Sequence, residues 1–594
     1  MKEDNNGSLI SRRKFLAHAA TIATASITAP LLAGASSAQS ATVKTVRPTR
    51  SSTRPNIIFV FSDQERYFPK LPGNLTLPAH ERLAQNGVTF NNHYCPAVMC
   101  TSSRSVLMTG LQTVDNGMFE NVDVKYVSNL STDIPTIGHM LRQAGYYTAY
   151  KGKWHLSTEF EVEKMDVLLT KEMEKYGFSD YYSPGDTIAH TLGGYEFDHL
   201  ISGSAVTWLR RHGRRLADEG KPWCLFVSLI NPHDIMYFNT DKPGRAVQDT
   251  GHLTMRAAPA PRNALYEATW DMPVPKNLHQ PFSEPGRPGA HGEFDKMWGY
   301  VLGRVPLEHE RWQRFNDFYI NSLRAVDMQV NSILQELDAL KLTDRTAIVY
   351  TSDHGEMAGS HGLRGKGPFA YQEGIHLPLY MIHPDVRGGQ NTNALTGHID
   401  IVPTLLSIAG VEPGKVADFA KRDLPGKDFS SALSNPGQSH LHSVRDGILF
   451  TYSGLVTNDG DLFKVVAEAT EAGKKPGMSM MRQGYKPNLK KRGSLRTVFD
   501  GRYKFSRYFS PLEHNSPETI ENLYMWNDVE LFDLEADPHE MDNLALDRKT
   551  NQNLIMAMSS KLETLIKAEI GLDNGRELPN IPFVDWEVDL KRTS

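Results

Sequence analysis

Four short runs of apolar, β-forming residues constrain the fold of this chain more than any other feature. Each run is continuously apolar rather than alternating, which is typical of a parallel strand buried on both faces. The runs are Asn56–Phe61, Tyr146–Tyr150, Cys224–Leu229 and Thr346–Thr351. Helical patterns lie between them, at residues 134–144 and 310–340. This alternation predicts an α/β fold with a large, mostly parallel sheet sandwiched by helices.

The last part of the sequence has a different pattern. Two β-type runs flank Asp500-Gly501, which is a strong hairpin signal, and residues 529–534 are another strand candidate. An amphipathic helix then ends at Gly571. We therefore predict a large domain over residues 54–430 and a smaller C-terminal α+β subdomain, with a short antiparallel sheet, over residues 431–594.

The N-terminus has the composition of an export signal. Arg12 and Arg13 precede a mildly apolar run at residues 15–34 and a small-residue stretch at residues 33–41. We expect residues 1–41 to be a twin-arginine signal peptide and residues 42–53 a linker, which places the protein in the periplasm or outside the cell. The apolar run is weak, because it holds His18 and several Thr and Ser, so a permanent membrane anchor is the poorer interpretation of it. No other stretch reaches about 18 uninterrupted apolar residues, so we expect no stable membrane span.

Composition argues against one class of partner. The chain has 64 Lys and Arg against 69 Asp and Glu, a formal net charge of −5. A nucleic-acid binder driven by phosphate neutralisation would show a basic excess, so we expect no nucleic-acid partner. The three cysteines Cys95, Cys100 and Cys224 are too few for a disulfide framework, although a single Cys95–Cys100 bridge stays open.

Polar side chains collect just past the four predicted strands. In open α/β sheets, ligands bind beyond the carboxyl ends of the strands. The segments at these positions are Ser62-Asp63-Gln64, Gly152-Lys153-Trp154-His155, Asn231-Pro232-His233-Asp234 and Ser352-Asp353-His354-Gly355. Together they supply carboxylate, amide, imidazole and ammonium groups, a set that can hold one metal ion and clamp one anion.

Two of these segments offer ligands for a divalent cation. Asp63, Gln64, Asp353 and His354 supply oxygen and nitrogen donors of the type that such cations bind. One pair alone is typical of a turn in which the carboxylate bonds its own backbone. Two pairs at the same sheet edge favour a metal site.

Cys100 begins a short helical stretch that ends at Gly110. A helix N-terminus favours anions, which includes a thiolate. From chemistry alone, a nucleophile and a buried structural thiol are equally good interpretations of this residue.

Several segments resemble the sulfatase family. Cys100-Thr101-Ser102-Ser103-Arg104, continuing to Thr109-Gly110, is similar to the signature Cys-x-Pro-Ser-Arg and the stretch that follows it. Gly152–Leu156 resembles the second signature, and Asp353–Gly355 with Gly365–Gly367 resembles the second metal pair and its downstream lysine. Residues 530–545 are similar to the family's C-terminal subdomain, so the resemblance extends from Asn56 to Ala545.

The resemblance implies the fold of the alkaline phosphatase superfamily and a formylglycine-dependent sulfatase, with residues 54–430 as the catalytic domain. Such an enzyme hydrolyses a sulfate ester to an alcohol and inorganic sulfate. A cytoplasmic maturase would oxidise Cys100 to formylglycine (3-oxoalanine), and Asp353 is the implied base. One divalent cation would be held by Asp63, Gln64, Cys100, Asp353 and His354. Calcium is the first choice, with manganese as the alternative, because an imidazole ligand is less typical of calcium.

The resemblance also implies roles for the charged residues around the nucleophile. Lys153 and Lys366 neutralise the sulfate oxygens, and Arg104 holds the formylglycine hydroxyls and partners the carboxylates. His233 or Lys366 protonates the leaving alcohol. His155 orients or deprotonates the remaining hydroxyl.

Three positions differ from the common family pattern. Ser102 stands where the signature has proline, and Gln64 and His354 stand where many arylsulfatases have Asp and Asn. The Asp-Gln with Asp-His combination resembles choline sulfatases and phosphonate monoester hydrolases. Two alternatives are therefore a phosphonate monoester or phosphodiester hydrolase on the same scaffold, and a silent secreted binding protein that keeps Cys100 as a thiol. The small-molecule or carbohydrate ester stays open among polysaccharide, aryl and choline sulfates.

Overall fold

The computed structural model describes residues 54–161, 168–183, 185–186, 190–474, 484–485 and 487–579. The predicted export signal (residues 1–41) and the predicted linker (residues 42–53) therefore lie outside the described residues. Contacts group Ser52–Ser594 into one compact unit, which contains both sheets. The subdomain boundary between residues 430 and 431 stays a prediction.

Within the described residues, the larger sheet has eight strands in the order β3-β4-β1-β5-β7-β2-β6, with β8 paired to β2. Its strands are β1 (Asn56–Asp63), β2 (Val88–Tyr94), β3 (Tyr147–Gly152), β4 (Trp223–Pro232), β5 (Thr346–Ser352), β6 (His376–Leu377), β7 (Leu379–Ile382) and β8 (Gln390–Gly397). Strands β3, β4, β1 and β5 are parallel neighbours, and β7 runs antiparallel to β5. These four parallel strands are the predicted ones, so the mostly parallel sheet is confirmed.

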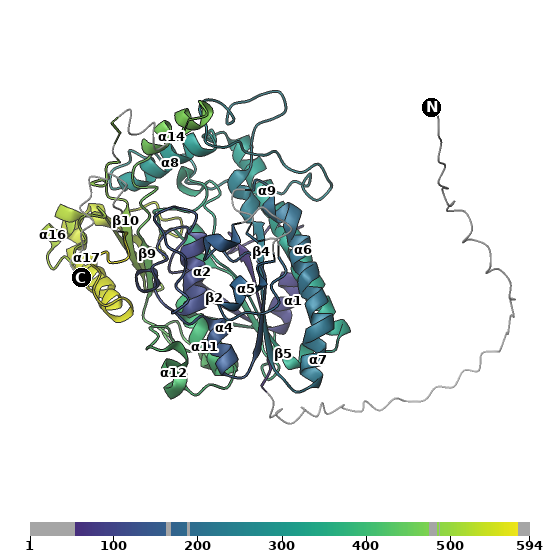
Figure 1. The fold of residues 1–594 in the computed structure, drawn as a ribbon. Helices are drawn as coiled ribbons and strands as arrows, with labels where there is room; N and C mark the ends of the chain where they lie inside the picture. Colours follow the sequence, from purple (N-terminus) through teal and green to yellow (C-terminus); the bar gives the residue numbers. More distant parts are fainter. Residues whose placement is uncertain are drawn as a thin grey trace, which may run out of the picture. The chain divides into compact units, whose positions relative to one another are not determined.

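Helices cover both faces of this sheet (Figure 1). Successive residues of a strand face opposite sides, so Ile57 and Phe59 of β1 belong to one hydrophobic core while Ile58 and Val60 belong to the other. Among the helices that contribute to the first core are α2 (Cys100–Thr109), α4 (Ile137–Gln143) and α11 (Ile401–Ile408). Among those that contribute to the second are α1 (Pro78–Asn86), α6 (Gly193–Trp208) and α9 (His309–Ala339). All eight residues of β1 are buried, which explains its continuous apolar sequence.

The second sheet has four antiparallel strands in the order β12-β11-β10-β9. Its elements are β9 (Ile448–Tyr452), β10 (Ser494–Phe499), β11 (Tyr503–Phe509) and β12 (Asp528–Asp533), with helix α17 (Arg548–Glu569) packed on one face. Strands β10 and β11 form the predicted hairpin, and Gly501 takes the positive φ of 97° that its turn requires. The predicted smaller antiparallel sheet is thus confirmed.

The parallel strands set the position of the site. Because β1, β4 and β5 run in the same direction, their carboxyl ends lie at one edge of the sheet. Among the described helices, none is both long enough and apolar enough to cross a bilayer.

Candidate active site

Two strand ends and one helix start meet at the carboxyl edge of the parallel strands. Strand β1 ends at Asp63, β5 is followed by Asp353 and His354, and α2 begins at Cys100. One ligand atom from each of these four residues lies within 4.8 Å of the others, and all four residues are buried. The Cys100 Sγ lies 3.3 Å from His354 Nε2 and 3.7 Å from Asp63 Oδ1.

The backbone of Gln64 joins the two predicted metal-ligand pairs. Its φ of 75° lies in the left-handed region, which directs its N–H to Asp353 Oδ1 at 3.1 Å. A non-glycine residue in this region is uncommon and is found where the surroundings fix it, as at functional sites. Tyr319 provides part of that support, because its hydroxyl donates to the Gln64 carbonyl at 2.6 Å.

Arg104 lies one helical turn after Cys100 and connects both carboxylates. Its Nη2 donates to Asp63 Oδ2 and its Nε donates to Asp353 Oδ2, each at 2.9 Å. Its Nη1 donates to Ser228 Oγ at 2.7 Å. The paired guanidinium offsets the repulsion between two buried carboxylates, which lets them lie close together.

Two lysines flank the Cys100 side chain. Lys366 Nζ lies 2.9 Å from Cys100 Sγ, and Lys153 Nζ lies 3.8 Å from Cys100 Sγ and 2.7 Å from Asp63 Oδ2. Burial alone raises the pKa of the Cys100 thiol, but Lys153, Lys366 and His354 outweigh it and hold that pKa well below its ordinary value. Two ammonium groups in this arrangement can hold an anion such as a sulfate group between them.

Two histidines complete the set of predicted residues. Neither ring nitrogen of His155 has a hydrogen-bond partner among the described residues, but its Nε2 lies 3.6 Å from Asp123 Oδ1. His233 is buried near the same carboxylate and thiol, since Asp63 and Cys100 both act on its pKa. Burial outweighs the attraction of Asp63 and lowers the pKa of His233 to about 4.

The remaining cysteines take no part in a disulfide. Cys95, Cys100 and Cys224 are all free, which answers the question of a Cys95–Cys100 bridge. The Cys95 Sγ lies 3.7 Å from the carbonyl of Gly374 instead.

A second acidic cluster lies outside the site and has a different character. It contains Glu293, Asp459 and Asp461. Lys491 Nζ lies 2.8 Å from Glu293 Oε2 and 2.6 Å from Asp459 Oδ1, so a lysine already supplies the positive charge there. Among the described residues, the Asp63 cluster is therefore the better metal site.

Comparison with known proteins decides the family. The family model described as Sulfatase matches residues 55–411, which is more than half of the chain. The chain belongs to the sulfatase family. Sulfatases are sulfuric ester hydrolases, and they generally use a metal ion and formylglycine. The resemblance found in the sequence, and the enzyme class it implied, are confirmed.

Two curated relatives are similar to this sulfatase over more than half of its length. A choline-sulfatase of Rhizobium meliloti is 27% identical over 380 residues, covering 60% of this chain and 68% of the relative. An N-acetylglucosamine-6-O-sulfatase of Bacteroides thetaiotaomicron is 26% identical over 432 residues, covering 66% of this chain and 73% of the relative.

Solved structures share the fold. A protein in complex with its substrate D-glucosamine-2-N,6-O-disulfate has a TM-score of 0.59 at 20% identity, covering 87% of this chain and 99% of the other. A phosphonate monoester hydrolase from Silicibacter pomeroyi has a TM-score of 0.58 at 18% identity, covering 88% and 96%. The larger mixed sheet with its flanking helices is thus the sulfatase fold.

The structure adds three carboxylates that the sequence did not single out. Asp186 accepts the backbone N–H groups of Trp154 and His155 at 2.6 Å each, and holds His155 at its φ of 56°. Asp123 faces the His155 ring. Glu356, two residues after His354, accepts from the Gln64 amide. Of the three, only Glu356 could have been noticed in the sequence, because it lies two residues after the predicted ligand pair Asp353-His354.

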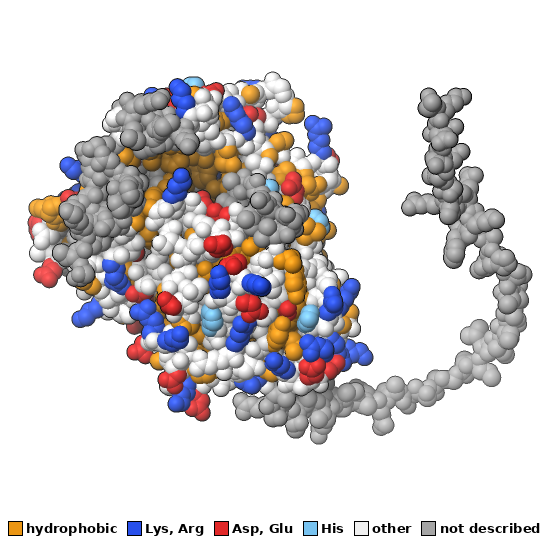
Figure 2. Space-filling model, in the orientation of Figure 1, with side chains coloured by type: hydrophobic (Ala, Val, Ile, Leu, Met, Phe, Trp, Pro, Cys, Tyr) orange, Lys and Arg blue, Asp and Glu red, His pale blue; other side chains and the backbone are white. Residues whose placement is uncertain are grey.

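Charged side chains of both signs are mixed on the face of the molecule that Figure 2 draws. On the face drawn in Figure 2, Lys and Arg side chains are interspersed with Asp and Glu, and a hollow in its upper half has hydrophobic side chains on its wall. This mixed charge is unlike the continuous basic patch of a nucleic-acid binder.

Proposed function

We propose that this sulfatase hydrolyses its ester through a nucleophile derived from Cys100. The observation that carries the proposal is the position of the Cys100 Sγ, within the ligand cluster of Asp63 and Asp353 and 2.9 Å from Lys366 Nζ. A cytoplasmic maturase would oxidise the thiol to formylglycine. Hydration of that aldehyde gives two hydroxyl groups on the residue-100 side chain.

The donor set fits one divalent cation. Asp63 and Asp353 supply oxygens, His354 supplies a nitrogen, and residue 100 lies beside them. The Gln64 amide oxygen, 3.0 Å from the Lys366 Nζ that also contacts Cys100, would add a further oxygen. We propose calcium because most of these donors are oxygens, with manganese as the alternative because of the imidazole. When bound, the cation would lower the pKa of a neighbouring hydroxyl and offset the negative charge of the sulfate.

Side chains around residue 100 carry out the first half of the reaction. Lys153 and Lys366 hold the sulfate oxygens, and Asp353 accepts the proton of the attacking hydroxyl. As the new oxygen–sulfur bond forms, the ester oxygen–sulfur bond breaks. His233 or Lys366 gives its proton to the leaving alcohol. A sulfate held beside His233 favours its protonated ring and so raises the pKa of His233 from about 4.

The second half regenerates the aldehyde. His155 takes the proton of the other hydroxyl on residue 100, and the carbon–oxygen bond to sulfate then breaks. The covalent intermediate therefore resolves without attack of water on sulfur.

We propose a sulfated carbohydrate as the substrate class. The N-acetylglucosamine-6-O-sulfatase relative and the structure with a bound disulfated glucosamine support it. Choline sulfate is the next substrate to test because of the choline-sulfatase relative. A phosphonate monoester hydrolase is the second candidate function, favoured by the Asp-Gln and Asp-His pairs and by the shared fold.

A matched pair of substrates tests this choice. We expect a higher kcat/KM for an aryl sulfate than for the corresponding aryl phosphonate monoester, and sulfate release from at least one sulfated sugar or choline sulfate in a panel. Cys100→Ala removes the nucleophile, so activity on all of them falls by on the order of 10³-fold or more. A higher kcat/KM for the phosphonate would favour the second candidate.

A further inference from the structure

The amide ligand Gln64 is held at both ends. Its Nε2 donates to Glu356 Oε2, and its Oε1 accepts from Lys366 Nζ at 3.0 Å. All three side chains are buried, and Gln64 and Glu356 are both 0% exposed. An amide has one acceptor end and one donor end of nearly the same shape, so its neighbours decide which end faces the ligand cluster.

Glu356 is itself fixed by backbone groups. Its Oε1 accepts from the N–H of Ala358 at 2.9 Å and from the N–H of Gly365 at 2.7 Å. A carboxylate carries no proton to donate, so both of its oxygens act only as acceptors. Gln64 can therefore satisfy it only with its NH₂ group, which turns the amide oxygen toward Lys366 Nζ, the ammonium group that lies 2.9 Å from Cys100 Sγ.

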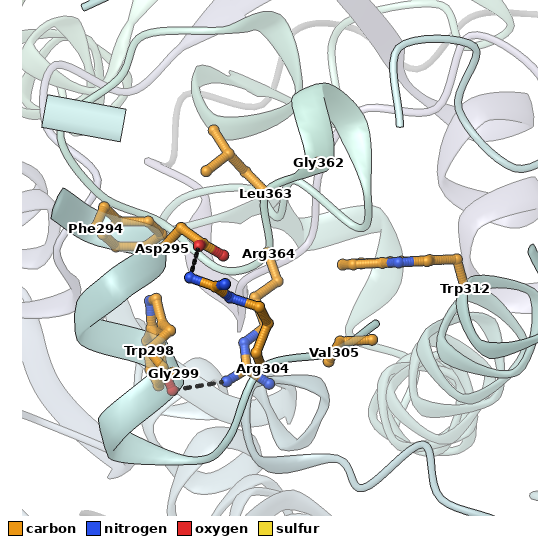
Figure 3. A pocket seen from close by; sticks show the side chains of 10 residues that line it. All are labelled: Phe294, Asp295, Trp298, Gly299, Arg304, Val305, Trp312, Gly362, Leu363 and Arg364. Carbon is orange, nitrogen blue, oxygen red and sulfur yellow. Dashed lines mark hydrogen bonds and ion pairs between the residues drawn. The ribbon is translucent and has the colours of Figure 1, made fainter. Parts of the chain in front are cut away.

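The loop that holds Glu356 is anchored at its far side. Arg364 lies next to Gly365 and donates from Nη2 to the carbonyl of Gly303 at 2.9 Å, and its guanidinium lies 5.1 Å from the centre of the Trp298 ring. Figure 3 shows Arg364 reaching down beside Trp298 of helix α8 (Gly289–Val301), with Arg304 turned to Asp295. The loop therefore presents Glu356 in one position.

We propose that Glu356 is the positioning residue that makes Gln64 a metal ligand, by fixing its amide with the oxygen toward the cation. The inference rests on the proposed metal site. It also accounts for an amide at a position where many arylsulfatases have a carboxylate. In this chain the carboxylate belongs to Glu356, which contacts the Gln64 amide and orients it. Metal ligands held by such partners typically lose about 10- to 100-fold in affinity when the partner is changed.

An isosteric swap tests this role by cation binding. Glu356→Gln places an NH₂ group opposite the NH₂ group of Gln64, so we expect the affinity for Ca²⁺ or Mn²⁺ to fall by about 10- to 100-fold. The double variant Gln64→Glu/Glu356→Gln reverses donor and acceptor at this contact and has the same net charge as the wild type. Introduced into the Gln64→Glu variant, Glu356→Gln should therefore strengthen cation binding instead of weakening it.

The measurement is equilibrium dialysis of the full chain with Ca²⁺ and with Mn²⁺ after chelator treatment. Each variant is prepared in the same host, with an equal state of residue 100 shown by mass and a folded state shown by a melting transition. Glu530→Gln is the matched control, because Glu530 is a buried carboxylate of β12 that accepts from Tyr371 and Tyr508. It should leave cation affinity unchanged.

The outcomes separate the inference from the proposed function. If the wild type binds a cation and Glu356→Gln weakens binding equally in both backgrounds, or not at all, Glu356 does not orient Gln64 and the inference fails alone. If the wild type binds neither cation, the proposed metal site fails and the inference fails with it. The sign reversal between the two backgrounds is the result that supports the positioning role.

Discussion

Among single residues, Arg104 is the one that pairs with both carboxylates of the candidate metal site, Asp63 and Asp353. Its side chain is 1% exposed and pairs with two carboxylates that are 0% exposed, Asp63 and Asp353. Its guanidinium also lies 5.0 Å from the centre of the Phe61 ring. Removing one partner of a buried ion pair leaves an uncompensated charge in a low dielectric, which costs about 3 to 5 kcal/mol.

We predict that Arg104→Met lowers the free energy of unfolding by about 3 to 5 kcal/mol and abolishes sulfate release. Urea unfolding checks the stability and ion chromatography checks the sulfate. Arg445→Met is the control, because Arg445 is similarly buried and pairs with Asp400 and Glu569 at 2.9 Å each. Arg445→Met should lose a similar free energy of unfolding, yet it should still release sulfate at urea concentrations below its unfolding transition. A loss under about 1 kcal/mol in Arg104→Met would contradict the account.

Sequence reasoning found the site residues that follow predicted strands and missed the ones that hold them. Asp63, Lys153 and Asp353 were found because a strand end fixes where the next side chain lies. Asp186 was missed because it comes from a long connection and meets His155 only through the fold. Asp123 lacks a local signal for the same reason.

At the scale of elements, a buried charged network holds the end of β1 against two helices. Glu65 accepts from Ser62 Oγ at 2.7 Å and meets His80 Nε2 of α1 at 3.0 Å. His80 Nδ1 lies 2.6 Å from Asp327 Oδ1 of α9. Burial lowers the pKa of His80, but Glu65 and Asp327 outweigh it and raise that pKa from 6.5 to about 10.

This network predicts a pH-dependent contribution to stability. Because the pKa of His80 is higher in the folded chain, its stabilisation is present in full below about pH 6.5 and is lost as pH rises through about 10. We expect urea unfolding from pH 6 to 10 to show that the difference in free energy of unfolding between the wild type and His80→Gln shrinks, by up to about 1.4 kcal/mol per pH unit. The exposed His440 provides the control variant, His440→Gln, which is measured over the same pH range. A constant gap for His80→Gln would contradict the prediction.

The parallel strands β3, β4, β1 and β5 of the larger sheet were predictable from the sequence, whereas β2, β6, β7 and β8 were not. The predicted strands are buried on both faces, so hydrophobicity alone marks them. Strand β2 was missed because Asn91 and Asn92 interrupt its apolar pattern and lie half-buried near the sheet edge. Strand β7 is only four residues long, which is too short for a periodic signal.

At the scale of the whole molecule, the smaller sheet braces the segment that follows Lys366. Lys504 Nζ of β11 donates to the carbonyl of Ala370 at 2.7 Å, and the Tyr371 hydroxyl donates to Glu530 Oε1 of β12 at 3.0 Å. These contacts join residues more than a hundred positions apart, which a local pattern does not predict. They explain why the C-terminal sheet belongs to the catalytic unit.

We also propose that the folded, matured chain is exported. The support is the Arg12-Arg13 pair before an apolar run, which is typical of the twin-arginine route for folded cargo. Under this proposal, Cys100 is oxidised in the cytoplasm before transport, and the protein acts in the periplasm or outside the cell.

One measurement tests the central claim most directly: the mass of the peptide around residue 100, from natively expressed protein in each cell fraction, compared with sulfate release by the same sample. We predict that the exported fraction carries the aldehyde at residue 100, and that activity rises in proportion to it. Exported protein that releases sulfate while holding only the unmodified thiol would contradict the proposed nucleophile. Protein confined to the cytoplasm would contradict the export.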